Sequence, residues 1–262
     1  MRTITYNIYM CRGYPKGISE RSNFSITELL ADALMRYEPD IVTFSEMPSE
    51  SAACAIAERL GMKTVFFPSP EGCHGALLTR FEVLESRNCP LQSGGRPEDL
   101  FTRHWGRAVL HTGSDELIVH SAHLFPNAQS SMHAKEVEEM IRVIQDDMKS
   151  GRSILLQGDL NHEPEDNAYK RWREANLVDS FVAAGIGPGG TYRADQPDQR
   201  IDYIFVYGPI LQRLCECRVL SEVPFQPDPS VSEPWCLSDH LPVMATFSLP
   251  LEHRRQKCLS QQ

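Results

Sequence analysis

The chain has 262 residues, of which 41% are hydrophobic and 23% are charged, and its formal net charge is −9. This composition is typical of a globular protein that is long enough to bury a large core in one domain. The negative charge argues against broad electrostatic attraction to nucleic acid or anionic membranes, because both favour a positive field on the protein. A local phosphate site is still compatible with it, since a bound cation can supply positive charge there.

Eight cysteines are scattered along the chain without a Cys-x-x-Cys pair, which argues against a zinc cluster and favours free thiols in a reducing compartment. The opening residues, MRTITYNIYM, alternate like a strand and lack the apolar core of a signal peptide. No apolar stretch approaches the roughly 20 residues of a membrane span. We therefore expect a cytoplasmic protein with no transmembrane segment, unless a leader sequence has been removed.

Strand and helix patterns alternate along the chain, which predicts layered α/β structure. Two helices are predicted in the first part, over 25–37 and 49–61, where apolar residues recur at helical spacing. Ser25 and Glu28 fit a capping box, and Gly61 fits the position after a helix end. The strands predicted in this part cover 2–8, 39–46, 63–67 and 75–80.

Residues 88–105 are rich in glycine, proline and polar residues, and we expect a loop or lid there. The next two strands, 107–112 and 116–124, are predicted to form a hairpin. Further along the chain, helices are predicted over 128–149 and 164–176, and strands over 153–159, 200–208, 211–220 and 239–249.

The strands 200–208 and 211–220 are expected to be neighbours that turn at the Gly-Pro pair between them. A proline-rich loop covers 223–236, and we expect substrate specificity to reside in this loop and in the earlier predicted lid, because loops on a rigid scaffold usually carry it. The chain has no linker that would divide it. We therefore expect one domain over 1–250 and a short polar tail over 251–262.

Two segments of the sequence resemble each other. DIVTFSE at 40–46 and SILLQGD at 153–159 are both apolar strands that end in a carboxylate and lead into a helix. If two similar halves of the chain face each other, Glu46 and Asp159 meet at one rim. The C-terminal ends of strands are where ligand sites usually form in layered α/β proteins.

Several predicted strands end, or are interrupted, at an acid, an amide or a histidine. These residues are Asn7, Glu46, His123 with Asn127, Asp159 with Asn161, Asp202, and Asp239 with His240. Taken alone, each has an ordinary structural explanation: a core amide, an Asx turn, a packed histidine, or an acid paired with an arginine. The function therefore has to be argued from the whole set.

Four carboxylates, at Glu46, Asp159, Asp202 and Asp239, would repel one another strongly if they converged without a cation. Convergence would call for a hard divalent metal. Mg²⁺ suits such a site because it accepts few protein ligands and keeps waters for a phosphate. Histidines beside it suit proton transfer or contact with a phosphate. The absence of clustered thiols and of an HExxH motif favours phosphoester hydrolysis over zinc peptidase chemistry.

These motifs resemble those of the endonuclease/exonuclease/phosphatase superfamily, which includes DNase I-like nucleases, sphingomyelinases and inositol polyphosphate 5-phosphatases. The similarity runs in order from Asn7 to about residue 248, through TYNI, PDIVTFSEM, GALLTR, SAHL, GDLNHEP, RIDYIF and SDHLPV. Where the family usually has a Gln before the Glu, this chain has Ser45. We expect this change to affect contacts with the substrate or around the metal ligands, and to leave metal binding itself intact.

The resemblance implies a four-layer α/β/β/α sandwich, in which two mixed β-sheets pack face to face with helices outside. It also implies a metal site and a phosphate contact. Glu46, with Asn7 nearby, would hold Mg²⁺, and Asp239 would be a second metal-side ligand. Mn²⁺ could replace Mg²⁺. Asn127 would contact the substrate phosphate.

The remaining residues have catalytic roles by the same resemblance. Asp159 would orient the attacking water and help to deprotonate it, and Asn161 would hydrogen-bond the phosphate or the nucleophile. Asp202 would pair with His240 and fix its tautomer. His240 and His123 would stabilise the phosphate or assist proton transfer.

The function implied is a divalent-metal-dependent phosphoesterase, and we favour a phosphodiesterase that hydrolyses a P–O bond by in-line attack of activated water. Its partner would be a phosphoester substrate: a small phosphodiester, a lipid head group or a nucleic acid. We expect a monomer. Two alternatives stay open: a DNA or RNA nuclease of the same fold, and a catalytically silent metal-binding interaction module. The silent module should have lost some of the site residues, whereas all are present here.

Two motifs argue against the inositol phosphatase branch. That branch carries a Trp-Cys-Asp-Arg-type stretch where this chain has DQRIDYIF, and an Asn-Tyr-Arg stretch where this chain has NHEP. The net charge of −9 also makes an abasic-site nuclease less favoured, because such enzymes usually present a basic face to DNA.

Overall fold

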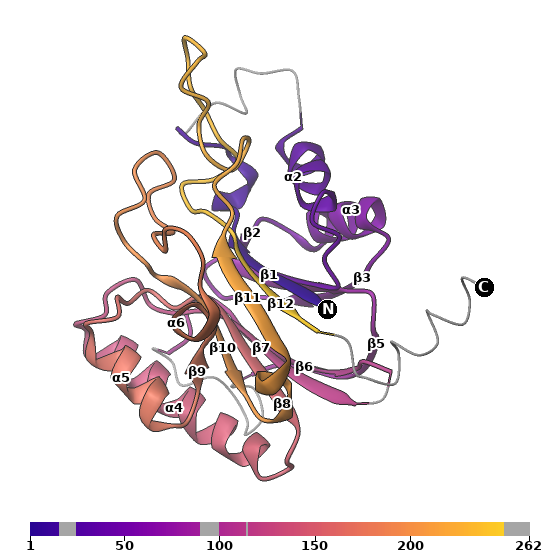
Figure 1. Ribbon diagram of the computed structural model, residues 1–262, viewed down its shortest axis with the longest axis vertical. Helices are drawn as coiled ribbons and strands as arrows, with labels where there is room; N and C mark the ends of the chain where they lie inside the picture. The colour runs from indigo at the N-terminus through magenta and orange to yellow at the C-terminus, as the bar shows by residue number, and fades with distance from the viewer. Residues whose placement is uncertain (16–24, 90–99, 114, 249–262) are drawn as a thin grey trace.

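Two six-stranded β-sheets pack face to face in the computed structural model, and helices cover the outer face of each sheet (Figure 1). The structure describes residues 1–15, 25–89, 100–113 and 115–248. This arrangement confirms the predicted four-layer α/β/β/α sandwich. The predicted polar tail, 251–262, lies outside the described residues, so the boundary of the domain stays a prediction.

The first sheet combines strands from the two ends of the chain. In spatial order its strands are β11 (Leu214–Val219), β12 (Val243–Phe247), β1 (Arg2–Asn7), β2 (Ile41–Met47), β4 (His74–Thr79) and β3 (Lys63–Phe67). Only β1 and β2 run parallel, and the other neighbours are antiparallel. The central pair is thus a parallel pair whose C-terminal ends lie at the same edge.

The second sheet has the same design. In spatial order its strands are β5 (Glu82–Asn88), β6 (Trp105–His111), β7 (Glu116–His123), β8 (Ser153–Asp159), β10 (Asp202–Tyr207) and β9 (Val178–Asp179). Here β7 and β8 form the parallel pair, again among antiparallel neighbours. Two parallel pairs, one in each sheet, therefore form the centre of the sandwich, and the two similar segments, 40–46 and 153–159, supply one strand of each pair.

Helices α2 (Ile26–Met35) and α3 (Glu50–Leu60) cover the first sheet, and α4 (Ser131–Met148) and α5 (Asn167–Glu174) cover the second (Figure 1). The Ser25 side chain accepts the Glu28 backbone N–H at 3.4 Å, which starts α2 where the capping motif predicted. Gly61, with a φ of 65°, ends α3 in the left-handed conformation that favours glycine.

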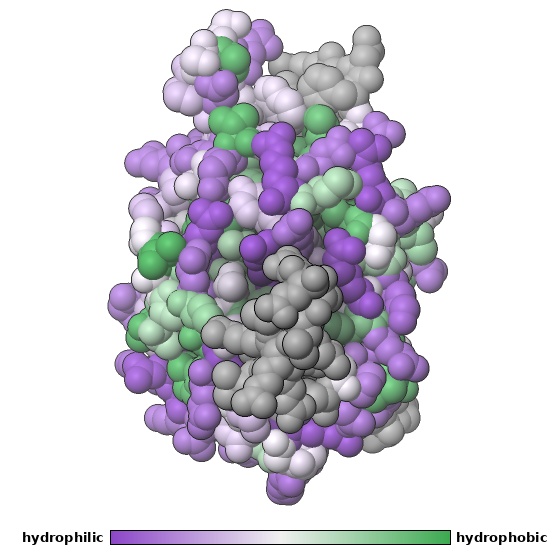
Figure 2. Space-filling model, turned by 45° about the vertical axis from the view of Figure 1, so that its right-hand side comes forward, coloured by the Kyte–Doolittle hydropathy of each residue, from purple (hydrophilic) through white to green (hydrophobic). Residues whose placement is uncertain are grey.

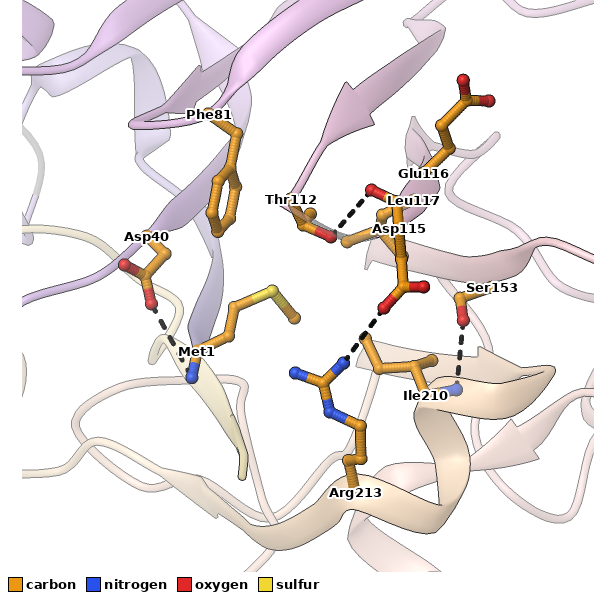
Figure 3. Close-up of a pocket in the computed structure, with 10 residues that line it drawn as sticks. All are labelled: Met1, Asp40, Phe81, Thr112, Asp115, Glu116, Leu117, Ser153, Ile210 and Arg213. Atoms are coloured by element: carbon orange, nitrogen blue, oxygen red, sulfur yellow. Dashed lines mark hydrogen bonds and ion pairs between the residues drawn. The ribbon is translucent and has the colours of Figure 1, made fainter. Parts of the chain in front are cut away.

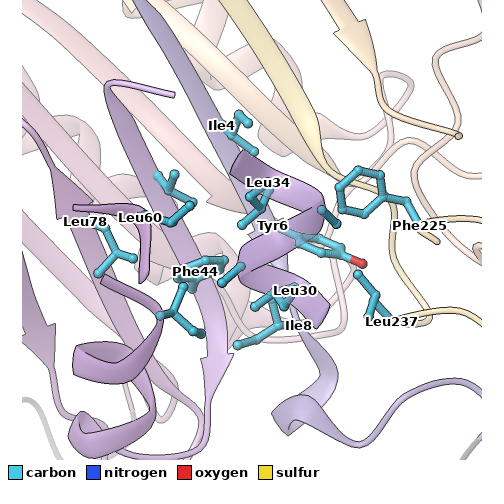
Figure 4. Packing of buried hydrophobic residues seen from close by; sticks show 14 of the residues in the cluster. Ile4, Tyr6, Ile8, Leu30, Leu34, Phe44, Leu60, Leu78, Phe225 and Leu237 are labelled. Carbon is cyan, nitrogen blue, oxygen red and sulfur yellow. The ribbon is translucent and has the colours of Figure 1, made fainter. Parts of the chain in front are cut away.

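The apolar faces of the helices bury the outer faces of the sheets. Leu30 and Leu34 of α2 pack in one buried cluster with Ile4, Tyr6 and Phe44 of the first sheet (Figure 4). A second cluster joins α4 and α5 to the second sheet, and a third lies between the sheets. Central strands are therefore buried on both faces, which explains why their sequences are continuous apolar runs.

The two sheets are also joined by buried polar contacts. The Gln157 side chain of β8 accepts a hydrogen bond from Thr3 of β1 at 2.8 Å and donates one to Thr43 of β2 at 2.9 Å. All three residues are buried. Buried amides need such partners, and these bonds fix the position of β8 against the β1–β2 pair.

One predicted pairing is wrong. The strands predicted over 200–208 and 211–220 exist as β10 and β11, but they belong to different sheets. After Gly208, which has a φ of 84°, the short 3₁₀ helix η3 (Pro209–Arg213) carries the chain from the second sheet to the first. A tight hairpin would have required the chain to reverse within one sheet.

Besides the 3₁₀ helices η1 (Tyr9–Cys11) and η3, two strands and one α-helix were not predicted: β5, β9 and α6 (Ser180–Ala184). The β5 strand is an exposed edge with charged residues, so it lacks the apolar alternation that identifies a strand. Of the predicted lid, 90–99 lie outside the described residues and residue 105 begins β6. The last strand begins at Val243, later than predicted.

The surface is mainly hydrophilic on the face seen in Figure 2, and apolar residues are scattered over it. Large exposed apolar side chains among the described residues are Met35, Leu84, Val182, Ile186, Val223 and Val231. Within the described part of the chain, no helix combines the length and the apolar character that a membrane span needs. The seven cysteines of this part are free thiols.

A small hollow of about 120 Å³ lies near the N-terminal ends of the central strands, lined by residues such as Leu117, Ser153 and Ile210 (Figure 3). Its charged side chains are paired: Arg213 lies 3.8 Å from Asp115, for example. It is therefore a gap between the layers at the end of the sandwich away from the polar strand ends.

Gly158, at the end of β8, is required by its surroundings. Its φ is 151°, and a Cβ there would fall on the carbonyl oxygen of Ala122 in the neighbouring β7. We expect Gly158→Ala to lower the free energy of unfolding by about 3 kcal/mol, because it combines backbone strain with a clash against backbone. Chemical denaturation measures this change.

Gly187→Ala is the matched control, since Gly187 also has a positive φ of 74° but open space around its Cβ. Its free energy of unfolding should fall by only about 1 kcal/mol, which is the cost of the left-handed backbone conformation for a residue with a Cβ. Equal losses in the two variants would show that the close approach of β7 does not matter.

Candidate functional site

The predicted polar residues meet at one edge of the sandwich because the central strands of both sheets end there. Asn7 ends β1 and Glu46 lies near the end of β2, while His123 and Asp159 end β7 and β8. In the parallel β7–β8 pair, His123 lies directly opposite Asp159. The two sheets therefore present one amide, two acids and a histidine to the same rim.

Asn7 joins the two sheets at this rim. Its side-chain nitrogen donates to a Glu46 carboxylate oxygen at 3.3 Å and to Oδ2 of Asp159 at 2.9 Å. Glu46 belongs to the first sheet and Asp159 to the second. The amide oxygen of Asn7 accepts the backbone N–H of Tyr9 at 3.1 Å, which sets the orientation of the amide. Asn7 thus has a fixed donor group between two carboxylates.

His240 is held between two acids of the second sheet. Its Nδ1 lies 2.9 Å from Oδ2 of Asp202, and its Nε2 lies 3.8 Å from Oδ2 of Asp159. All three side chains are buried. The predicted pairing of Asp202 with His240 is therefore present in the geometry, and it directs Nε2 toward Asp159 and the rim.

The charges of the acids control the protonation of His240. Burial favours the neutral imidazole, but the charges of Asp202 and Asp159 outweigh it and raise the pKa of His240 to about 10. Burial, followed by the charge of Asp202, raises the pKa of Asp159 to about 7. His240 is thus a cation near neutral pH, and Asp159 can gain or lose a proton there.

The other predicted groups respond mainly to burial. Burial raises the pKa of Glu46 and of Asp239, since it disfavours an isolated negative charge. Burial, with a contribution from His104, lowers the pKa of His123 well below its usual range. His123 is therefore neutral, and its Nε2 lies 3.5 Å from Oδ2 of Asp159.

Asp159 uses its two carboxylate oxygens differently. Oδ1 accepts the backbone N–H of Asn161 at 3.1 Å, which closes an Asx turn after the strand. Oδ2 faces Asn7, His123 and His240. The structural explanation of the GDLN motif and the functional one are therefore compatible, because each concerns a different oxygen.

Asn161 and Asn127 lie farther out on the same rim. Asn161 has a positive φ of 51°, and its amide donates to the Leu124 carbonyl oxygen at 2.9 Å. Asn127 is exposed, and its side-chain oxygen accepts the backbone N–H of Gln129 at 3.0 Å. Each asparagine thus has one side-chain group committed to the backbone, and both residues line the same cleft.

A cleft of about 440 Å³ brings these groups together. Of the predicted residues it is lined by Glu46, His123, Asn127, Asp159, Asn161, Asp239 and His240. Asn7 and Asp202 lie behind this lining and hold the residues in front of them. The structure therefore brings all nine predicted site residues to one place, seven at the cleft surface and two beneath it.

The cleft lining also includes polar residues that were not predicted, namely Arg103, His162, Glu163, Asp166, Tyr192 and Gln199. The centre of the Tyr192 ring lies 4.8 Å from that of His240. Tyr192 and Gln199 belong to an irregular segment before β10, where neither strand nor helix periodicity marks the sequence. Their position just before the RID motif was the only sequence signal for them.

The predicted specificity loops differ in their relation to the cleft. Arg103, from the end of the predicted lid, lines the cleft and lies 5.8 Å over the Phe125 ring. No residue of 223–236, a stretch described throughout, lines it. Ser45 is buried in β2 beside Asn7 of β1, and its effect on the substrate stays a prediction.

The donors at the rim fit a hard divalent cation. Glu46 and Asp239 are half-buried carboxylates that reach the cleft, and oxygen is the ligand that Mg²⁺ prefers. Asp159, Asp202 and His240 also offer atoms within 4.8 Å of one another. However, Nδ1 of His240 is already bonded to Asp202, and a protonated imidazole does not bind metal. The carboxylates at the cleft surface are therefore the better site.

Comparison with known proteins gives the family. The model of the endonuclease/exonuclease/phosphatase family matches residues 4–240. The chain belongs to this family. Its members are hydrolases that act on phosphoester bonds, and the aligned region contains all nine predicted site residues, from Asn7 to His240. No curated protein sequence matches the chain.

Several solved structures are similar to this protein over almost the whole chain. A mannosyl-6-phosphatase from Bacteroides thetaiotaomicron has a TM-score of 0.72 at 19% identity, covering 95% of this chain and 100% of that one. An AP endonuclease from Archaeoglobus fulgidus has a TM-score of 0.69 at 20% identity, with coverage of 95% and 100%. The human Nocturnin catalytic domain has 0.69 at 20% identity, with coverage of 95% and 93%. These likenesses show the fold.

The raised pKa of Asp159 predicts how a cation should affect stability. Its ordinary value is 3.8, and burial raises it to about 7 in the folded protein. The stability that this group contributes is therefore present below about pH 4 and lost as the pH rises through about 7. A cation held by Glu46 at the same rim would favour the ionised form of Asp159, because it would offset the negative charge that this carboxyl group gains. We expect Mg²⁺ to raise the melting temperature more at about pH 8 than at about pH 5.

Thermal unfolding with and without MgCl₂ measures this effect. Glu46→Gln should reduce the shift at the higher pH, because it removes one carboxylate from the rim. Glu82→Gln, at an exposed acid of β5 outside the cleft lining, is the control and should keep the shift. A shift that is absent, or equal at both pH values, would contradict a cation site at this rim.

Proposed function

We propose that this protein is a divalent-metal-dependent phosphodiesterase that hydrolyses a P–O bond by in-line attack of water. The observation that carries the proposal is the pairing at the cleft of a carboxylate able to accept a proton with an imidazolium cation. Asp159 and His240 supply these groups, 3.8 Å apart. Attack of water on phosphorus requires a base that takes a proton from the water and a cation that stabilises the negative charge on the phosphate.

The proposed metal ligands are Glu46 and Asp239, with Asn7 orienting Glu46 through its amide. A bound Mg²⁺, or Mn²⁺ in its place, would offset the negative charge that develops on the phosphate oxygens. Without such a cation, the acids of the rim repel each other and the phosphate. Metal binding and substrate binding are therefore expected to depend on each other.

Asp159 is the proposed base. Its pKa of about 7 is close to neutral pH, where a general base is most effective. The donor group of Asn7 and the charge of His240 both favour its ionised form. Oδ2, which accepts the Asn7 amide and faces the histidines of the site, is the proposed oxygen for the water, whereas Oδ1 is bonded to the Asn161 backbone at the turn. The Asx turn thus fixes the direction from which the water is held.

His240 is proposed to stabilise the phosphate as a cation. Asp202 holds Nδ1–H, so Nε2–H is left to donate toward the cleft. His123 is neutral and can donate or accept a hydrogen bond there without adding charge. The side-chain NH₂ groups of Asn161 and Asn127 each have an N–H that can donate to a phosphate oxygen. Negative charge on the phosphate would thus meet one full cation and several dipoles.

A small substrate is favoured over a long nucleic acid. The cleft lining adds Glu163 and Asp166 to the acids of the site, and Arg103 is its one arginine among the described residues. Together with the net charge of −9, this acidic lining disfavours a polyanion. A nuclease stays the second candidate, because an AP endonuclease is among the similar structures. The monomeric state and the cytoplasmic location stay predictions.

A hydrolysis panel tests the proposal directly. With Mg²⁺ we expect turnover of bis-p-nitrophenyl phosphate and of at least one small phosphodiester or lipid head group, and loss of activity with EDTA that Mg²⁺ or Mn²⁺ restores. Plasmid DNA, abasic DNA, sphingomyelin, inositol phosphates and a sugar monophosphate complete the panel. Turnover of DNA alone would favour the nuclease, and Mg²⁺ binding without turnover of any ester would favour a silent module.

Two substitutions test the assigned residues. Asp159→Asn and His240→Ala should each lower kcat by about 10³-fold, because each removes the base or the cation from the reacting centre. Steady-state kinetics measures this loss, and circular dichroism checks that both variants stay folded. Asp146→Asn and His111→Ala, at exposed sites outside the cleft lining, are matched controls with unchanged kcat. Hydrolysis that survives either cleft substitution would refute that assignment.

A further inference from the structure

An irregular segment before β10 holds the backbone on both sides of His240. The backbone N–H of Ala194 donates to the Asp239 carbonyl oxygen at 2.7 Å, and that of Leu241 donates to the Thr191 carbonyl oxygen at 2.7 Å. Tyr192 forms an antiparallel bridge with His240 between these two bonds. Three consecutive residues around the imidazole are thus paired with this segment, which lies outside both sheets.

The side chain of Thr191 reaches the other half of the Asp–His pair. Its Oγ1 accepts the backbone N–H groups of Ile201 and Asp202, each at 3.2 Å. Asp202 is the first residue of β10, so these two N–H groups mark where the strand begins. Thr191 is fully buried. The two donors would have no water to replace the hydroxyl if it were removed.

Thr191 therefore bonds to both chain segments that carry the pair. Its carbonyl oxygen holds the residue after His240, and its hydroxyl oxygen holds the backbone of Asp202. The bond between Nδ1 of His240 and Oδ2 of Asp202, at 2.9 Å, depends on the distance between these two segments. A small shift of either backbone would lengthen this bond and turn the imidazole away from the phosphate.

We propose that Thr191 is a positioning residue that sets the distance and angle between Asp202 and His240. It does not reach the cleft surface itself, and it acts through the two residues that it holds. This inference rests on the proposed phosphoesterase function for its effect on rate. Its effect on the Asp202–His240 hydrogen bond is independent of any activity.

Thr191→Val and Thr191→Ser are the two main test variants. Valine keeps the shape of threonine but cannot accept a hydrogen bond, so Asp202 should shift. We expect Thr191→Val to lower kcat by about tenfold to 100-fold with KM changed by less than about threefold, since misplacement of a catalytic group acts mainly on the chemical step. Thr191→Ser keeps the hydroxyl and should restore kcat to within about threefold of the wild type.

Thr79→Val is the matched control. Thr79 is also fully buried, and its hydroxyl also accepts a backbone N–H, from Phe81 at 3.1 Å, near the start of β2 and away from the cleft. Thr79→Val should lower the melting temperature and leave kcat unchanged. If Thr191 were only a structural residue, Thr191→Val would behave in the same way. Thr191→Ala, which removes the hydroxyl and adds no methyl group in its place, serves if the valine variant does not fold.

A proton NMR measurement separates this inference from the proposed function. The Nδ1–H proton of His240, held by Asp202, should give a downfield resonance in the wild type, in Thr191→Ser and in Thr79→Val. It should weaken or move upfield in Thr191→Val. An enzyme without phosphoesterase activity would refute the proposed function and still allow this test. An unchanged resonance and an unchanged kcat in folded Thr191→Val would overturn the role of Thr191.

Discussion

Carboxylates that are buried together must be matched by donors or by positive charge, and the site is built around this constraint. Asn7 places one amide group between acids of the two sheets, and His240 places a cation between two acids of the second sheet. Glu46, Asp159 and Asp202 are thus each held by a group that comes from another part of the chain. The position of the two sheets, set by polar contacts such as those of Gln157, therefore determines the chemistry of the rim.

Much of the fold could be predicted because the central strands carry strong local signals. Apolar runs such as Ile154–Leu156 indicate strands buried on both faces, and capping residues such as Ser25 mark helix starts. The separation of β10 and β11 into different sheets could not be predicted. Local patterns identify a strand but do not show to which sheet it belongs. Here the short η3 helix carries the chain from the second sheet to the first between these two strands.

In the site too, residues marked by the local sequence could be predicted, and residues placed by contacts distant in the sequence could not. Acids and amides at strand ends, such as Glu46 and Asp159, stand out because they interrupt apolar sequences. Residues such as Tyr192 and Thr191 do not, since they lie in an irregular segment whose position depends on hydrogen bonds to residues about 50 positions later. A polar residue is noticed in a sequence when it interrupts the regular spacing of apolar residues in a strand or helix. An irregular segment has no such spacing, so its functional residues are not marked.

The two carboxylate oxygens of Asp159 accept from different donors, and this determines what an amide of the same shape would do at this position. One oxygen must accept the Asn161 N–H, so an amide in this position would keep its single oxygen at the turn. Its NH₂ group would then point at the Asn7 amide nitrogen, which is itself a donor. The replacement would thus set two donors against each other where a donor had met an acceptor. A side chain of the same shape would carry the opposite hydrogen-bonding polarity into the cleft, and the junction between the two sheets would lose its bond.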